Sequence, residues 1–357
     1  MTGKKILIAP LDWGLGHATR CIPVVQELLR KGHEVMIAAD GNGEHILREA
    51  FPELQFIYLK GYHLSYSKYI PAWLKILLQL PKIFSAMRRE HSELKKIIEE
   101  HDIDIVISDN RFGLWNKKVK TVYITHQVMI KCPVGLKFFE PLLHALHTRT
   151  IRKFNHCWVP DYADENNLSG DLSHKYKLPT NAEFIGPLSR FDSDKNQVIE
   201  NDLCIILSGP EPARSAFEKK IFDLLKSYTG KCIVILGRPG HKHPQVKSGT
   251  KIFSHLKSDE LEKAILSSRF VICRSGYSGI MDLVALKKNA LLIPTPGQTE
   301  QEYLGKYLSS KKIFQYREQK NFTLLDHASE SFSVERKFGD RGRLKEAINK
   351  IIPGKNQ

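Results

Sequence analysis

Short apolar runs alternate with helical patterns along the whole chain, and this alternation constrains the fold more than any other feature. Lys5–Ala9 (KILIA) predicts a buried strand, Ile22–Arg30 an amphipathic helix and Glu34–Ala39 the next strand. The same pattern continues to Glu183–Ile185. Repeated strand–helix pairs are typical of an α/β fold, in which crossover helices cover a parallel sheet.

The alternation stops once and then restarts. Residues 189–201 are polar and lack periodicity, and a second series begins at Leu203–Ser208. A chain of 357 residues also favours two domains. We expect two Rossmann-like domains that face one another across a cleft, arranged as follows: N-terminal domain 1–188, linker 189–201, C-terminal domain 202–335, and a C-terminal helix within 336–357 that packs back on the N-terminal domain.

Charge narrows the class of partner. Lys and Arg number 54 against 39 Asp and Glu, a net charge of +15. This excess indicates nucleic acid, a phosphate-bearing substrate or an acidic membrane surface. No nucleic-acid recognition motif accompanies it, so we expect no nucleic-acid partner. Hydrophobic residues (42%) and charged residues (26%) have globular proportions, which excludes a disordered chain.

Two absences limit the possibilities further. No apolar run reaches the roughly 18 residues of a membrane-spanning helix, and the first strand-like run is too short for a signal-peptide core. We therefore expect a cytoplasmic protein. The six cysteines are never closer than 25 residues and form no C-x-x-C, so the sequence predicts neither a zinc site nor a redox pair.

A glycine loop, residues 12–20 (DWGLGHATR), follows the first strand and precedes a helix. A helix N-terminus disfavours the protonated form of His17, which suits a general base. The alternative is a histidine that caps its own turn. Arg20 would bind an anion or pair with a carboxylate. As a dinucleotide fingerprint the loop lacks its third glycine, although Asp40 ends the second strand where a ribose-binding acid would lie.

A second glycine loop, residues 273–282 (CRSGYSGIMD), also lies between a strand and a helix. Backbone N–H groups at such a helix start can bind an anion without a lysine. Asp282, farther along the helix, could accept both hydroxyls of a ribose. The alternative is that Ser278 only caps the helix. In residues 294–303, amides and acids that can bind sugar hydroxyls open the next helix: Gln298, Glu300, Gln301 and Glu302.

Together these motifs resemble family 28 glycosyltransferases of the GT-B architecture, the group that includes the transferase of lipid II synthesis. Its Arg-Ser-Gly motif, with an acid seven residues after the serine, is matched by Arg274–Gly276 and Asp282. The family has Glu at the latter position, and Asp shortens the reach. Its Gln-Gln pair falls on Gln301 and Glu302, so the second position differs. The resemblance runs from about residue 4 to 310.

The resemblance implies inverting transfer of a hexosyl or N-acetylhexosaminyl group from a nucleotide sugar, with UDP expected, to a hydroxyl group, without a metal or other cofactor. The base would be His17 or Asp109, which ends the strand IDIVISD. The charge of the leaving group would be met by loop 275–279, with Arg274 or Arg214. The donor would be bound by Gly209, Arg214, His255, Leu256, Arg274, Ser275, Gly276, Tyr277, Ser278, Gly279, Asp282, Gln298, Gln301 and Glu302. The acceptor side would comprise Gly14, Gly16, Arg20, His126 and Gln127.

A basic, apolar stretch bears on the acceptor. Residues 68–89 hold five basic residues and no acids, and residues 111–153 hold nine basic residues against Glu140 alone. Such a stretch would lie on an anionic membrane and favours a lipid-linked acceptor. Alternatively, it is a core helix pair with solvated lysines.

Two functions other than sugar transfer stay open. The run Gly14–Cys21 is similar to a GT-B-like UDP-sugar hydrolase, in which His17 would activate water, and a non-enzymatic nucleotide-sugar sensor is the third reading.

Overall fold

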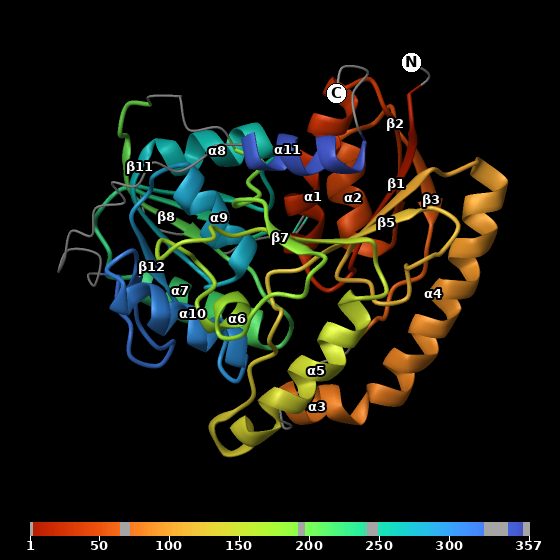
Figure 1. The fold of residues 1–357 in the computed structure, drawn as a ribbon. Helices are drawn as coiled ribbons and strands as arrows, with labels where there is room; N and C mark the ends of the chain where they lie inside the picture. The colour runs from red at the N-terminus through yellow and green to blue at the C-terminus, as the bar shows by residue number, and fades with distance from the viewer. Residues whose placement is uncertain are drawn as a thin grey trace. The chain divides into compact units, whose positions relative to one another are not determined.

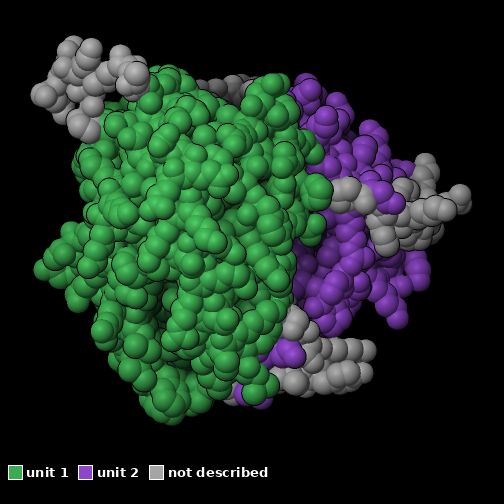
Figure 2. Space-filling view, turned by 90° about the vertical axis from the view of Figure 1, so that its right-hand side faces the viewer, with its two compact units in different colours: residues 1–65, 76–190, 339–357 green, residues 66–75, 191–338 purple. Residues whose placement is uncertain are grey.

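The computed structural model describes residues 3–64, 72–191, 197–238, 240, 249–324 and 342–352. The chain divides into two compact units (Figure 2). Unit 1 comprises residues 1–65, 76–190 and 339–357, and unit 2 comprises residues 66–75 and 191–338. Of the basic stretch predicted at 68–89, residues 68–71 lie outside the described part.

Unit 1 is built on a seven-stranded parallel sheet with the order β3-β2-β1-β4-β5-β6-β7 (Figure 1). The central strand β1 is fully buried at Ile6, Leu7 and Ile8, because helices cover a parallel sheet on both faces. The strands are β1 (Lys5–Pro10), β2 (Glu34–Ala39), β3 (Gln55–Tyr58), β4 (Ile105–Asp109), β5 (Lys120–Ile124), β6 (His156–Val159) and β7 (Ala182–Phe184).

The first helix on this sheet begins earlier than the sequence predicts, at Leu15 and not at Ile22. Helix α1 begins at Leu15, with Gly14 at its N-cap and a φ of 89°, a conformation that favours glycine. His17 and Arg20 therefore lie on a helix instead of in a turn. Helix α4 begins at Leu80 because Pro81 is tolerated in a first turn. The helical elements are α1 (Leu15–Arg30), α2 (Gly41–Ala50), α3 (Ala72–Leu78), α4 (Leu80–His101), η1 (Val134–Phe139), α5 (Glu140–Ile151), α6 (Asp171–His174) and α11 (Gly342–Ile351).

Helix α11 belongs to unit 1 although it lies near the end of the sequence. Lys31 Nζ donates to Asn349 Oδ1 at 2.6 Å, and Lys120 Nζ donates to the Ile351 carbonyl at 2.9 Å. Leu344, Ala347, Ile348 and Ile351 form its buried face. This helix thus packs on unit 1 through one apolar face.

Unit 2 repeats the architecture with six parallel strands in the order β10-β9-β8-β11-β12-β13. Its core gathers side chains from all the central strands and from α7, including Phe217, Ile221 and Ile272. The strands are β8 (Asn201–Ile206), β9 (Cys232–Ile235), β10 (Thr250–Phe253), β11 (Ser268–Cys273), β12 (Ala290–Leu292) and β13 (Gln315–Tyr316); the helices are α7 (Ala213–Leu225), α8 (Ser258–Leu266), α9 (Tyr277–Ala285) and α10 (Thr299–Ser310).

Both sheets confirm the predicted α/β class of two parallel-sheet domains. In each, the chain order reverses beside the first strand, between β1 and β4 in unit 1 and between β8 and β11 in unit 2. Loops beyond the carboxyl ends of the strands at such a reversal are where open α/β sheets bind ligands. No helix in the described ranges is long and apolar enough to cross a membrane.

Candidate active site

In unit 1, four of the predicted residues meet beyond the carboxyl ends of β1, β4 and β5. Asp109 is the last residue of β4, and it lies opposite Pro10 of β1. Helix α1 supplies His17 and Arg20, one turn apart, and His126 follows β5. Thus the first crossover helix and two neighbouring strand ends bring these side chains together.

Arg20 is the hub of this cluster. Its Nε donates to Asp109 Oδ2 at 2.7 Å and its Nη2 donates to Asp109 Oδ1. The same guanidinium reaches His126 Nδ1 through Nη1 and His17 Nδ1 through Nη2, both at 2.9 Å. His17 Nδ1 also lies 3.3 Å from Asp109 Oδ2. We refer to His17, Arg20, Asp109 and His126 as the Arg20 cluster.

Burial divides the roles within the Arg20 cluster. Asp109 is fully buried, which opposes its ionisation, but the nearby charge of Arg20 and the contact with His17 lower its pKa to about 2. The His17 side chain keeps 14% exposure. Burial and then the Arg20 charge lower the pKa of His17, against the opposing effect of Asp109. At neutral pH the cluster therefore holds a buried carboxylate beside an uncharged imidazole that keeps some exposure.

A second cluster, which the sequence analysis missed, holds the segment after β3. Asp12 accepts hydrogen bonds from the backbone N–H groups of Tyr62 and His63 at 3.0 and 2.9 Å. Asp40 accepts from the Gly61 N–H at 3.1 Å and lies 2.8 Å from His63 Nε2. Asp40 thus binds the protein's own loop, which argues against the ribose role of a dinucleotide site. For Asp40, the signal in the sequence was its position directly after the second predicted strand.

A further buried ion pair anchors α4. Arg111 Nε donates to Glu90 Oε1 at 2.7 Å, and both side chains are fully buried. Tyr62 and the Gly113 N–H also donate to Glu90. This pair resembles the Arg20–Asp109 pair in burial but has no contact with His17.

Across the described ranges, no group of three or more His, Cys, Asp or Glu side chains is arranged to hold a metal ion.

The predicted acceptor-side residues His126 and Gln127 lie on a loop that is hydrogen-bonded to α6. Ser173 Oγ donates to the His126 carbonyl at 2.6 Å, and Met129 N–H donates to the Leu172 carbonyl at 2.8 Å. The N–H of Gln127 donates to Thr125 Oγ1 at 3.1 Å. The fold therefore brings the His126 ring to Arg20, whereas the Gln127 backbone is held by Thr125.

In unit 2, the predicted donor loop forms the start of α9. Gly276 is the N-cap, and the first hydrogen bond of the helix runs from the Ile280 N–H to the Gly276 carbonyl. Gly276, Ser278 and Gly279 are accessible, whereas Tyr277 is buried. A Cβ placed on Gly276 or Gly279 would meet nothing within 4 Å. The helix start therefore presents open backbone, where anions bind in other proteins.

The two arginines predicted to meet the leaving group have other partners. Arg274 donates to the carbonyls of Ile293 and Pro294 through Nη1, to the Ala213 carbonyl and Gln319 through Nη2, and stacks 4.0 Å over Phe217. It is 3% exposed. Arg214 is also buried and binds Glu218 and the Leu236 carbonyl. These contacts give both guanidinium groups partners within unit 2, where they join strand ends to α7.

The remaining donor residues shape loops at the same edge of the sheet. Gln301 Oε1 accepts from the Thr295 N–H at 2.9 Å, and its carbonyl accepts from Ser275 Oγ at 2.8 Å. Glu302 accepts from the Gly297 N–H at 2.8 Å. Loop 275–279 and the start of α10 are thereby joined. The other predicted positions in unit 2 lie beyond strand ends or on α9 and α10: Gly209 after β8, His255 and Leu256 after β10, Asp282 in α9, and Gln298 at the N-cap of α10.

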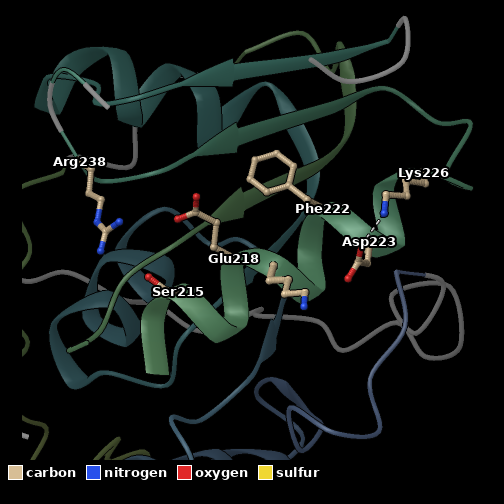
Figure 3. A pocket seen from close by; sticks show the side chains of 7 residues that line it. Ser215, Glu218, Phe222, Asp223, Lys226 and Arg238 are labelled. Carbon is tan, nitrogen blue, oxygen red and sulfur yellow. Dashed lines mark hydrogen bonds and ion pairs between the residues drawn. The ribbon is translucent and has the colours of Figure 1, made fainter. Parts of the chain in front are cut away.

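A shallow hollow of about 420 Å³ lies along the outer side of α7 (Figure 3). Its charged side chains are largely paired: Asp223 with Lys226, Glu218 with Arg214, and Arg238 with Glu211. None of the predicted site residues lines it. The lining residues are Ser215, Glu218, Lys219, Phe222, Asp223, Lys226 and Arg238.

Comparisons with known proteins agree with this arrangement. A model described as glycosyl transferase family 1 matches residues 4–129, and the model of the glycosyltransferase family 28 C-terminal domain matches residues 216–331. A Methanosarcina acetivorans protein described as an uncharacterized glycosyltransferase is 26% identical over 326 residues, covering 84% of this chain and 79% of the relative.

Solved structures share the fold at low sequence identity. The glycotransferase of kitacinnamycin has a TM-score of 0.68 at 12% identity, covering 99% of this chain and all of the other. The spinosyn rhamnosyltransferase SpnG, solved with thymidine diphosphate, has a TM-score of 0.58 at 12% identity, covering 98% of this chain and 92% of the other. With two glycosyltransferase models on separate parts of the chain, the protein is a glycosyltransferase of the two-domain GT-B fold that resembles family 28.

Proposed function

We propose that the protein transfers a sugar from a nucleoside-diphosphate donor to a hydroxyl group with inversion, and that His17 is the base. The observation that carries this proposal is the difference in burial and charge between Asp109, at the end of β4, and His17. Asp109 is fully buried and ionised, whereas His17 beside it is neutral and keeps 14% side-chain exposure. A base must be unprotonated and reachable, so His17 takes the role that the sequence left open between it and Asp109.

The chemistry follows from these positions. The acceptor hydroxyl gives its proton to Nε2 of His17 while its oxygen forms a bond to the anomeric carbon. The bond from that carbon to the phosphate oxygen breaks, and its electron pair leaves with the nucleoside diphosphate. The resulting imidazolium can donate from Nδ1 to Asp109, which lies 3.3 Å away. Such charge stabilisation lowers the barrier to proton transfer.

For the donor, the start of α9 is the proposed diphosphate site. Its open glycines, Gly276 and Gly279, allow a phosphate to approach the backbone, and the helix dipole favours negative charge there. Backbone amides would then meet the leaving-group charge without a metal. Since Arg274 and Arg214 are engaged elsewhere, we assign them no direct part in this step.

Asp282 and Gln301 are the proposed contacts for the nucleoside and the sugar. Asp282 lies on α9, three residues beyond Gly279 and six beyond Gly276, and is 9% exposed. SpnG, which shares the fold, was solved with thymidine diphosphate, and the family resemblance implies UDP. We therefore propose a pyrimidine nucleoside diphosphate and let the experiment choose between uridine and thymidine.

An apolar, basic surface on unit 1 supports a lipid-linked acceptor. Ile83 and Met87 of α4 pack against the same apolar cluster as Phe112, and Phe112 meets His147 of α5 edge-on at 5.6 Å. These neighbouring helices and their extensions expose apolar side chains together with Lys82, Arg88, Lys137 and Arg149. Exposed apolar groups among cations suit an anionic membrane surface. We call the following exposed residues the lipid patch: Leu77, Leu78, Phe84, Phe138, Phe139, Leu142 and Leu146.

The deciding experiment is a turnover screen of the purified full chain against UDP-sugars and TDP-sugars, with and without a lipid extract. We expect nucleotide release that requires the extract, together with a glycosylated lipid product. His17→Ala should keep nucleotide affinity and lose turnover by about a hundredfold or more, the usual contribution of a general base. Equal nucleotide release without an acceptor would identify a hydrolase instead. Full activity of His17→Ala would exclude His17 as the base.

A further inference from the structure

We propose that Arg20 is a positioning residue that decides which ring nitrogen of His17 carries the proton. The inference deepens the proposed function, because it rests on His17 being the base. It starts from the position of Arg20 within the Arg20 cluster, where one guanidinium contacts Asp109, His17 and His126.

The donor chemistry of arginine fixes the first step. A guanidinium is protonated at every relevant pH and can only donate. Arg20 lies 2.9 Å from Nδ1 of both histidines, so each Nδ1 accepts and the proton of each neutral ring lies on Nε2. In this state His17 presents an N–H group from Nε2.

Asp109 favours the other tautomer. Its Oδ2 lies 3.3 Å from the same Nδ1 of His17 and can only accept a hydrogen bond. One ring nitrogen holds either a proton or a lone pair, so Nδ1 serves Arg20 or Asp109, never both. The Arg20 contact is the shorter one, and we therefore assign the Nε2–H tautomer to the protein without substrate.

Catalysis needs the tautomer that Asp109 favours, with Nδ1–H toward Asp109 and the Nε2 lone pair toward the acceptor. The groups that face His17 are Arg20 on its own helix, Asp109 at the end of β4 and His126 after β5; Cys21 Sγ lies beside Asp109 at 3.8 Å. Among them Arg20 alone carries a permanent positive charge. It opposes the protonation of His17 and keeps the base uncharged at lower pH.

Removing Arg20 should therefore produce two changes. In Arg20→Met, His17 should move its proton to Nδ1, which nitrogen-15 NMR of the ring reads directly. The acid limb of the pH profile of kcat/KM should also move to higher pH, because Asp109 would face His17 without a counter-charge. Arg20→Lys keeps the charge and should keep the acid limb close to that of the wild type.

The control is Arg111→Met, which removes an equally buried arginine from the Glu90 pair. It should lower stability without moving the tautomer or the acid limb. If Arg20→Met does not fold, nitrogen-15 NMR of the wild type still tests the proposal, because the His17 ring should carry its proton on Nε2 in the protein without substrate; a proton on Nδ1 would refute it. An unchanged tautomer and acid limb would refute the proposal. The NMR readout needs no turnover, so it separates this failure from a failure of His17 as the base.

Discussion

Arg20 and Asp109 form a two-point ion pair that is sealed inside unit 1, with Nε 2.7 Å from Oδ2 and Nη2 bound to Oδ1. Neither side chain has more than 1% exposure. Burying two charges costs much desolvation energy, and even good geometry only offsets it. A pair of this kind adds little net stability, so we infer that its value lies in holding an ionised carboxylate 3.3 Å from His17 Nδ1.

The first prediction concerns Asp109→Asn. The amide keeps the shape but leaves Arg20 without its counter-charge, so the free energy of unfolding should fall by about 3–5 kcal/mol. Turnover per folded molecule should fall by about a hundredfold or more, because the imidazolium of His17 loses its anionic partner. Denaturant titration and steady-state kinetics measure the two effects.

Glu90→Gln is the matched control, since it breaks the other buried arginine pair. It should cost comparable stability and leave the turnover of the folded fraction near wild type. If both variants lose turnover equally, Asp109 acts only through the fold.

A second prediction tests the donor site. Asp282→Ala should weaken the binding of UDP or TDP, measured by calorimetry, by about tenfold or more, as expected for the loss of a hydrogen bond to a charged group. Asp223→Ala is the control, because Asp223 is an exposed acid of the same unit that pairs with Lys226 on the outer side of α7. Equal nucleotide affinity in the two variants would remove Asp282 from the site.

The lipid patch gives a third prediction. The protein should sediment with phosphatidylglycerol vesicles at low salt and be released as salt rises, since screening weakens the attraction between its cations and the lipid. The double variant Phe84→Ser with Phe138→Ser should sediment less. Val198→Ser removes an exposed apolar side chain from unit 2 and should sediment like the wild type. If the double variant also sediments like the wild type, the membrane contact lies outside the lipid patch.

The fourth prediction is a pH dependence of stability. Burial lowers the pKa of His147 to about 4, whereas an unfolded histidine titrates near 6.5. Between pH 4 and pH 6.5, His147 is therefore protonated in the unfolded chain and neutral in the folded protein. The free energy of unfolding should therefore fall as the pH drops from about 6.5 to about 4, by up to roughly 3 kcal/mol.

His147→Gln should flatten this part of the stability curve in urea titrations performed across the pH range. Substitution of the exposed His45 by Gln serves as the control and should leave the slope unchanged. If His147→Gln and wild type keep parallel curves, another group causes the dependence.

Local pattern was enough to predict the fold class. Apolar runs such as Lys5–Ala9 and Leu203–Ser208 predicted strands that the sheets contain as β1 and β8, because a strand buried on both faces must be apolar throughout. Several elements escaped prediction, and β10 and α5 show why. Edge strand β10 alternates exposed and half-buried residues over four positions, and α5 carries threonines and histidines among its apolar residues, so neither gives a strong periodic signal.

The sequence by itself determined that two glycine loops each follow a strand and precede a helix, and that Asp109 ends a strand. Tertiary structure decided what these residues touch. Arg20 and Asp109 are 89 positions apart, and only the pairing of β1 with β4 brings them together. Arg274 looked like a phosphate ligand, but carbonyls just beyond β12 and at the start of α7 accept its hydrogen bonds. A motif fixes which chemistry is available at a position, whereas burial and long-range partners fix which part of it is used.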